Sequence, residues 1–212
     1  MRQQLDVLLV QSNRGAADDA VAALAAAGHR VHQCYDDDVR GFPCRGVVES
    51  SACPLDGPID VVLSVRRRLN PWPTGLEGGV VCAIRAGLPV VEQGADETGP
   101  FTPWVTQRIT PHDDVVGACV AAVATVEQGL AAEIRLRIAR VMVATDIDPS
   151  TVTCWTEGDS TGLDVHVGVP GRLPRGVEQA IAVRTLDAVR SSGRTYGRVD
   201  VHVHDHDSPP AR

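Results

Sequence analysis

The chain has 212 residues, of which 43% are hydrophobic, 22% charged and 3% aromatic, and its formal net charge is −7. This composition is typical of a globular protein with an aliphatic core, and the acidic balance argues against a general nucleic-acid surface. All 20 basic residues are arginine, which excludes the mechanisms that need a lysine, namely Walker-type phosphate loops, Schiff-base enzymes and kinases.

The beginning of the chain shows no pattern of export or membrane insertion. No run of eighteen apolar residues is present, and the first four residues lead directly into a strand pattern. Six cysteines, scattered along the chain, are too few for a small secreted disulfide scaffold. We therefore expect a cytoplasmic protein without a membrane partner, and the acidic balance disfavours nucleic acid as a partner.

The first 110 residues alternate between strand and helix patterns. Leu5–Val10 is an almost continuous apolar run, which indicates a strand buried on both faces of a parallel sheet. Residues 16–27 place Ala and Leu at helical spacing, and Gly28 supplies a typical helix end. This alternation predicts a doubly wound α/β domain of the flavodoxin or Rossmann type over residues 1–110. The remaining patterns predict strands over 30–34, 59–65 and 88–92 and a helix over 76–86.

Residues 111–145 predict a helical connector. An Ala- and Val-rich stretch is followed by Gly129, a residue that favours a break or kink, and then by an apolar stripe at helical spacing. Within that stripe Ile134, Leu136 and Ile138 also alternate with charged residues, as they would in a strand. We favour the helix.

Residues 146–206 predict a small α+β domain, followed by a tail over 207–212. Alternating valines in the last two strands predict one apolar sheet face covered by the helix and one polar outer face. Imidazoles two residues apart on that outer face can share a metal ion or respond to pH, although alternation alone also requires polar residues there. The predicted strands cover 151–156, 163–169 and 198–204, the helix covers 174–190, and the outer face bears Asp164, His166, Asp200, His202, His204 and His206.

Polar residues follow the predicted parallel strands at their carboxyl ends, where open α/β sheets bind their ligands. Arginines opposite small polar residues at a helix N-terminus would suit a phosphate or carboxylate, and an acid after the second strand could hold a ribose hydroxyl. The G-x-G-x-x-G fingerprint of dinucleotide sites is missing. The edge therefore predicts either a site for a small anionic ligand or a solvated rim of ion pairs. The candidate ligand-binding residues are Ser12, Asn13, Arg14, Asp36, Arg66 and Arg67.

The crossover from residue 34 to residue 58 is rich in Gly and Pro and contains Cys34, Cys44 and Cys53. Long irregular connections in compact domains often have a function, and clustered thiolates can bind zinc or an iron–sulfur cluster. The fourth ligand would be Cys82 or His32. The spacings match no C-x-x-C signature, so plain thiols and a redox-active pair remain alternatives.

The C-terminal third resembles the alkaline shock protein family of small bacterial α+β domains. The similar segments are the helical residues 133–140, the strand 162–169, Leu173-Pro174 with Val177, and above all Val199-Asp200-Val201-His202-Val203-His204, which is similar to that family's closing V-x-V-x-V strand. The resemblance implies a non-enzymatic, self-associating module linked to envelope stress.

The first 95 residues resemble a receiver domain that lacks its chemistry. Val7–Val10 is followed by Gln11-Ser12-Asn13 where receivers carry an acidic metal-binding pair, and Ser64 stands where they carry the phosphorylated Asp. No lysine is available for the conserved switch role. The resemblance implies a domain that cannot accept an aspartyl phosphate.

From these patterns we expect a non-catalytic cytoplasmic regulatory or assembly protein, homo-oligomeric through its C-terminal sheet. The sequence contains no G-x-S-x-G elbow, and no similar arrangement in it indicates an enzyme. Two alternative functions remain. One is metal or iron–sulfur binding through the cysteine loop, and the other is sensing or turnover of a small anionic ligand at the carboxyl edge of the parallel sheet.

Overall fold

The computed structural model describes residues 4–35, 41–49, 52–67, 71–94, 99–158, 162–194 and 196–206. Two compact units divide the chain, Met1–Ala124 and Thr125–Arg212. The division falls inside one helix, so each unit is described by itself.

The N-terminal unit is built on a five-stranded parallel sheet. Its strand order, β2-β1-β3-β4-β5, is the flavodoxin-like order, and every pair of neighbours is parallel. The predicted doubly wound α/β fold is therefore confirmed. The fifth strand was not predicted from the sequence, because it is only three residues long and buries a single apolar side chain. The strands are β1 (Asp6–Gln11), β2 (Arg30–Gln33), β3 (Val61–Arg66), β4 (Val90–Gly94) and β5 (Gln107–Ile109).

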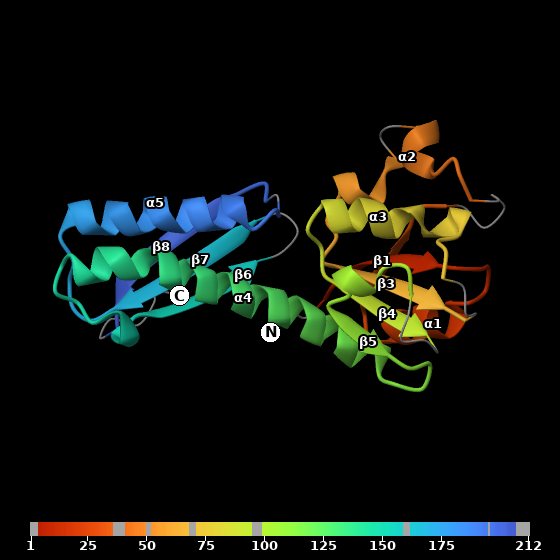
Figure 1. The fold of residues 1–212 in the computed structure, drawn as a ribbon, viewed down its shortest axis with the longest axis horizontal. Helices are drawn as coiled ribbons and strands as arrows, with labels where there is room; N and C mark the ends of the chain where they lie inside the picture. Colours follow the sequence, from red (N-terminus) through yellow and green to blue (C-terminus); the bar gives the residue numbers. More distant parts are fainter. Residues whose placement is uncertain are drawn as a thin grey trace. The chain divides into compact units, whose positions relative to one another are not determined.

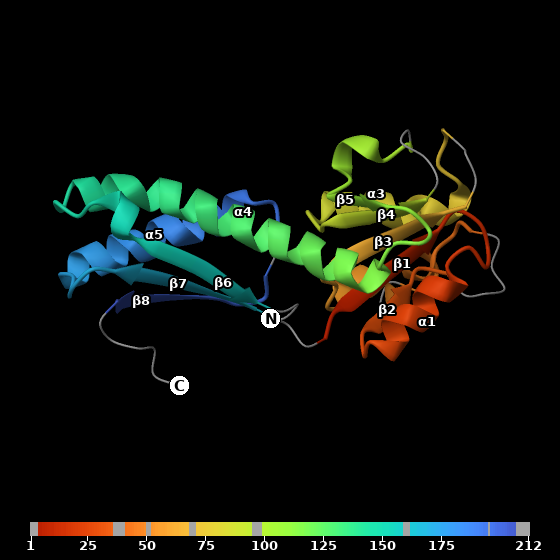
Figure 2. The ribbon, with the colours of Figure 1, turned by 90° about the horizontal axis from the view of Figure 1, so that it is seen from below.

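Helices cover both faces of this sheet. Helix α1 (Asp18–Ala26) lies on one side and α3 (Gly78–Arg85) on the other (Figures 1 and 2). The core on the α1 side also includes the first half of α4, through residues such as Ala118 and Ala122. The described residues of the crossover between β2 and β3 form short helical segments and no long helix, in agreement with the predicted irregular connection. The short helices of this unit are α2 (Arg45–Val48), η2 (Pro54–Asp56), η3 (Gly75–Glu77) and η4 (Thr102–Trp104).

The predicted connector is one continuous helix, α4 (Val115–Val143). The helix prediction for 130–143 is confirmed, but the expected break at Gly129 is wrong. A glycine in a helix interior costs only about 1 kcal/mol, which the packing on both sides of Gly129 outweighs. Among the described residues this is the one helix long and apolar enough to cross a membrane, with mean hydropathy 1.6. Its apolar residues are divided between the cores of the two units.

The C-terminal unit is a three-stranded sheet covered on one face by two helices. Strand β7 lies centrally, antiparallel to β6 and parallel to β8. The valines of β7 are buried in one core with residues of α5 and the second half of α4, and this confirms the predicted apolar face. Figure 2 shows the two helices on the same side of this sheet. In α5, the buried residues are Ile181, Thr185, Ala188 and Val189. The elements are η5 (Pro149–Thr151), β6 (Thr153–Gly158), β7 (Leu163–Val169), α5 (Arg175–Ser191) and β8 (Val199–Asp205).

Candidate functional site

A pocket of about 340 Å³ opens at the carboxyl end of β1 and β2. In a parallel sheet of this order, ligands bind outside the carboxyl ends of the strands near the point where the strand order reverses. The first strand, its neighbour β2 and the segment that leads into α1 all contribute to the pocket. It is lined by Leu9, Val10, Gln11, Arg14, Gly15, Ala17, Asp18, Val21, Gln33, Cys34, Tyr35 and Leu76.

One wall of the pocket is the tight turn between β1 and α1. Gly15 adopts φ +70°, a left-handed conformation that most side chains disfavour. A Cβ at this position would also lie 3.4 Å from a carboxylate oxygen of Asp18. The turn therefore brings Arg14 and Asp18, side chains of opposite charge, to the same wall. Of the predicted ligand-binding residues that the structure describes, Arg14 is the one that lines the pocket.

Two glutamines, Gln11 and Gln33, supply neutral hydrogen-bonding groups at the ends of β1 and β2. Neither glutamine was among the predicted site residues. Gln11 had a signal in the sequence, because it is the first polar residue after the apolar run Val7–Val10, whereas Gln33 directly follows His32 and has no such pattern before it. Tyr35, also in the lining, donates its hydroxyl to the carbonyl of Gly75 at 3.0 Å. That bond fixes the rim of the pocket to the start of η3.

Cys34 is the nucleophilic side chain in the lining, and it is buried. Burial raises the pKa of the Cys34 thiol to about 12, and the nearby thiols of Cys44, Cys53 and Cys82 act in the same direction. A thiol with such a pKa is protonated at neutral pH, and the thiolate is the reactive form. Cys34 is therefore poorly suited to act as a nucleophile in this pocket.

Ser12 and Asn13 hold the turn rather than line the pocket. Ser12 is buried, its backbone amide donates to the carbonyl of Val65 at 2.9 Å, and its hydroxyl donates to the Asn13 side-chain oxygen at 3.0 Å. These bonds tie the end of β1 to the end of β3. Asp36 lies outside the described residues.

The two arginines predicted after β3 make contacts with the protein itself. Arg66 is 7% exposed, and its Nε lies 2.8 Å from Oε1 of the fully buried Glu77. Arg67 donates its Nε to the carbonyl of Ala16 at 2.9 Å and lies 3.5 Å from the carboxylate of Asp19. Arg66 thus fixes η3 to the sheet, and Arg67 fixes the start of α1.

Ser64, which the resemblance to receiver domains aligned with their phosphorylated residue, is fully buried in β3. Its register partner on β4 is Glu92, a buried carboxylate that Arg108 approaches to 3.1 Å from β5. The serine hydroxyl is therefore covered from solvent beside a negative charge. Phosphoryl transfer to this position has no route from solution in this structure.

The crossover cysteines gather near the end of β2. The amide of Arg45 donates to the carbonyl of Cys34 at 2.9 Å, which places Cys44 beside that strand. A Cβ on Gly46 would lie 3.2 Å from the sulfur of Cys53. Cys82, by contrast, is exposed on α3. Within the described part of the chain, no three His, Cys, Asp or Glu side chains are positioned to hold a metal ion.

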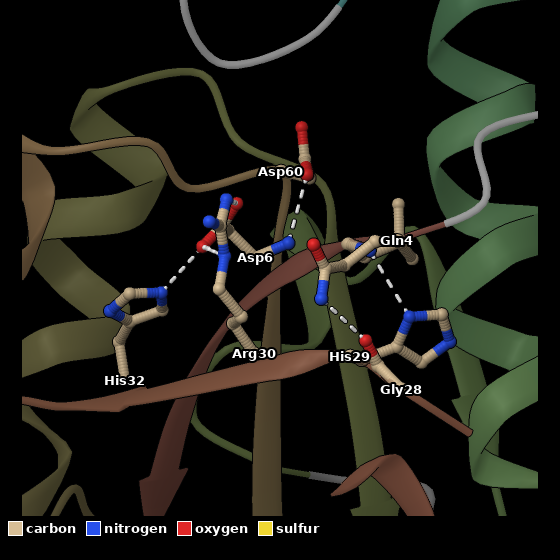
Figure 3. Close-up of polar contacts among 8 residues, drawn as sticks. Gln4, Asp6, Gly28, His29, Arg30, His32 and Asp60 are labelled. Carbon is tan, nitrogen blue, oxygen red and sulfur yellow. Dashed lines mark hydrogen bonds and ion pairs between the residues drawn. The ribbon is translucent and has the colours of Figure 1, made fainter.

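His32, the alternative fourth ligand, bonds to Asp6 and lines a second pocket with Gln33, Tyr35 and Arg45. Its Nε2 lies 2.6 Å from Oδ1 of Asp6, and Arg30 also donates to both oxygens of that buried carboxylate. The amide of Asp6 in turn donates to Asp60 at 2.9 Å (Figure 3). This cluster lies at the amino ends of β1, β2 and β3, where it fixes strand pairing rather than a ligand.

We expect Asp6→Asn to destabilise the N-terminal domain by about 1–3 kcal/mol at pH 7, because it weakens the bonds from Arg30 and His32. Burial raises the pKa of Asp6, but the bonds from Arg30 and His32 outweigh burial, and the net shift is below the ordinary 3.8. The Asp6 contribution is thus complete above pH 3.8 and is lost as the pH falls below it. Urea unfolding between pH 7 and pH 3 should show the wild type and the variant converging in acid. Asp56→Asn, at an exposed carboxylate, is the matched control, and an equal loss in that variant would contradict the assignment.

Comparison with known proteins gives little further information. No family model matches the chain. No curated protein matches it either, so the resemblance of the C-terminal third to the alkaline shock protein family has no support. Among solved structures, full-length FixJ from B. japonicum is similar with a TM-score of 0.35 and 12% identity, over 90% of this chain and 91% of that one. A similarity at this level identifies no function.

Proposed function

We propose that the protein is a non-catalytic regulatory protein whose N-terminal domain binds a small anionic ligand in the pocket between β1, β2 and α1. The observation that supports this most directly is the pocket itself. Its volume of about 340 Å³ is at the lower end of the range for small-molecule sites, which begins near 300 Å³. A compact metabolite fits this space better than a dinucleotide does.

The charges of the lining favour one class of ligand. Arg14 and the first turn of α1, which has no side-chain cap, favour a carboxylate or phosphate group. Asp18 on the same wall opposes a purely anionic molecule but accepts hydrogen bonds from a hydroxyl or ammonium group. Together they favour a ligand that carries one acidic group and one donor, such as a hydroxy acid, an amino acid or a sugar phosphate.

The absence of a catalytic arrangement in the lining supports a binding role. The described lining residues include no histidine, and the thiol among them, Cys34, is held in the protonated form by burial. Gln11, Gln33 and Tyr35 can orient a ligand through hydrogen bonds but are poor proton-transfer groups at neutral pH. The geometry therefore favours recognition without turnover.

Ligand binding should raise the melting temperature of the protein in the presence of a member of that class. We expect Arg14→Gln to weaken the binding of the best compound by about 10- to 100-fold, the value of one lost charge-assisted hydrogen bond. Calorimetric titration with hydroxy acids, amino acids and sugar phosphates would measure both effects. Arg85→Gln, at an exposed arginine on α3, is the matched control. Equal affinities for the Arg14→Gln and wild-type proteins, or no binding by any compound, would overturn the proposal.

A further inference from the structure

The outer face of the C-terminal sheet carries a row of stacked rings. Trp155 on β6, His166 on β7 and His202 on β8 are register partners across the three strands. The ring centroids of Trp155 and His166 are 4.9 Å apart with 6° between the planes, and those of His166 and His202 are 4.8 Å apart with 20° between the planes. We call these three side chains the ring ladder. His166 is its central member.

Two more histidines border the ring ladder, one on β8 and one directly after that strand. The ring of His204 approaches Trp155 edge-on at 5.2 Å and His166 at 6.1 Å. His206 lies with Nε2 3.0 Å from the hydroxyl of Thr153. Four of the seven histidines in the chain thus gather on the sheet face opposite to the buried valines. This density of titratable groups is the feature that requires an explanation.

The acidic groups near the ladder pair with His202 and Arg198 rather than with His166. Nε2 of His202 lies 3.0 Å from Oδ1 of Asp164, and Nε of Arg198 lies 3.0 Å from a carboxylate oxygen of Asp200. Arg198 also lies 3.5 Å from Asp164. A protonated His202 therefore has a counter-ion at hydrogen-bond distance.

His166 has no comparable partner. Its Nδ1 is buried, and no hydrogen bond reaches it from the described residues. The charged groups that act on it are His202 and His204 on β8, which oppose a positive charge, and Glu157 on β6 and Asp164 on its own strand, which favour one. The neutral form of His166 is therefore the one that fits between Trp155 and His202.

We propose that the ring ladder is a proton switch, in which neutral His166 keeps the three rings stacked and protonation of His166 separates them. A proton on His166 would place two imidazolium rings face to face at 4.8 Å when His202 is also charged. Like charges this close repel strongly unless solvent separates them. Acidification therefore loosens the contact of β7 with β8 at their outer surface and changes the charge on the ring that stacks on Trp155.

The direction of the pH response follows from the surroundings of His166. Burial beneath the neighbouring rings lowers the pKa of His166 below its ordinary 6.5, and the charges of His202 and His204 add to that effect. The open or unfolded form therefore binds the proton more readily than the stacked form does. The stabilising effect of the ladder is complete above pH 6.5 and is lost as the pH falls below that value.

Two other roles for this face fit the geometry less well. The faces of the His166 ring are occupied by Trp155 and His202, so no gap is left in which a nucleobase could stack. The described part of this unit also contains no three metal-ligating side chains placed around one point. The stacked geometry favours a response to protons over either ligand.

The test uses the full chain with Trp72→Phe and Trp104→Phe, so that Trp155 is the only tryptophan. Emission and near-ultraviolet circular dichroism would be followed from pH 8 to pH 5, with far-ultraviolet circular dichroism as the measure of folding. We expect one reversible transition with a midpoint below pH 6.5 and no loss of secondary structure. Adding His166→Phe should abolish it, because phenylalanine keeps a ring but cannot be protonated. Adding His112→Phe, at an exposed histidine of the N-terminal unit, should leave it unchanged.

A second measurement keeps the test decisive if the His166→Phe protein does not fold. The ring resonances of His166 in the single-tryptophan protein should titrate with the midpoint of the Trp155 signal. Three results would each overturn the proposal: a Trp155 signal that does not change between pH 8 and pH 5, a transition that persists without His166, or a His166 ring that protonates at or above pH 6.5.

Discussion

Replacing Arg66 with methionine should destabilise the N-terminal domain by about 3–5 kcal/mol, because it leaves the fully buried Glu77 without its counter-ion. Glu77 also accepts a hydrogen bond from the amide of Thr74 at 2.7 Å, so the loss of the ion pair disturbs the start of η3 as well. Amide hydrogen exchange in β3 would measure the effect on this domain alone. We expect exchange at Val62 and Leu63 to accelerate by roughly two to four orders of magnitude.

Two further variants identify the buried charge as the cause. Arg85→Met removes an exposed arginine of the same type and should change stability by less than about 0.5 kcal/mol. The double variant Arg66→Met/Glu77→Met removes both charges and should recover most of the loss, since an apolar pair of similar size is often no less stable than a buried ion pair. A double variant as unstable as Arg66→Met would show that the packing around Glu77, not its charge, accounts for the effect.

Ile138→Ala is expected to destabilise the C-terminal unit by about 2–5 kcal/mol. Ile138 is 1% exposed on α4, where it packs against the valines of the central strand in the core of this unit. Truncation to alanine removes three buried carbons and leaves a cavity that the surrounding aliphatic side chains fill only in part. Hydrogen exchange of the β7 amides, with Val165 and Val167 as reporters, would measure the loss.

Leu136→Ala provides the matched control on the same helix. Leu136 is 70% exposed, so its truncation should change stability by less than about 0.5 kcal/mol. The comparison also distinguishes a helix from a strand, because alternation in a strand would place Ile134, Leu136 and Ile138 on one face. Comparable losses for Leu136→Ala and Ile138→Ala would contradict the helix.

The elements that the sequence predicted well are those whose pattern reports burial directly. Leu5–Val10 is apolar at nearly every position because β1 lies at the interior of the sheet and is covered on both faces. The valines of β7 alternate because helices cover only one face of the smaller sheet. The third strand was placed about two residues early, at 59–65 instead of Val61–Arg66. Strand ends are set by pairing with neighbours, which a local pattern does not contain.

The sequence predicted where the candidate site lies, but it predicted only part of the set of residues that line it. The carboxyl edge of the parallel sheet does contain a pocket, and Arg14 lies in it. Arg66 could not be assigned from its own position, because its partner Glu77 lies eleven residues further along the chain. A signal for that partner was present in Thr74-Gly75-Leu76-Glu77, since the spacing T-x-x-E is typical of a capped helix start. Pairing between distant side chains is the information that the sequence pattern lacks.

In the parallel sheet, the strands at the two margins are shorter than those in the middle. The outermost described strands, β2 and β5, have four and three residues, whereas β1 and β3 have six each. Unpaired amides and carbonyls along an outer strand are the groups through which one molecule adds to the sheet of another. Strands this short expose few of those groups. The margins of this sheet are therefore poor templates for the addition of a further strand.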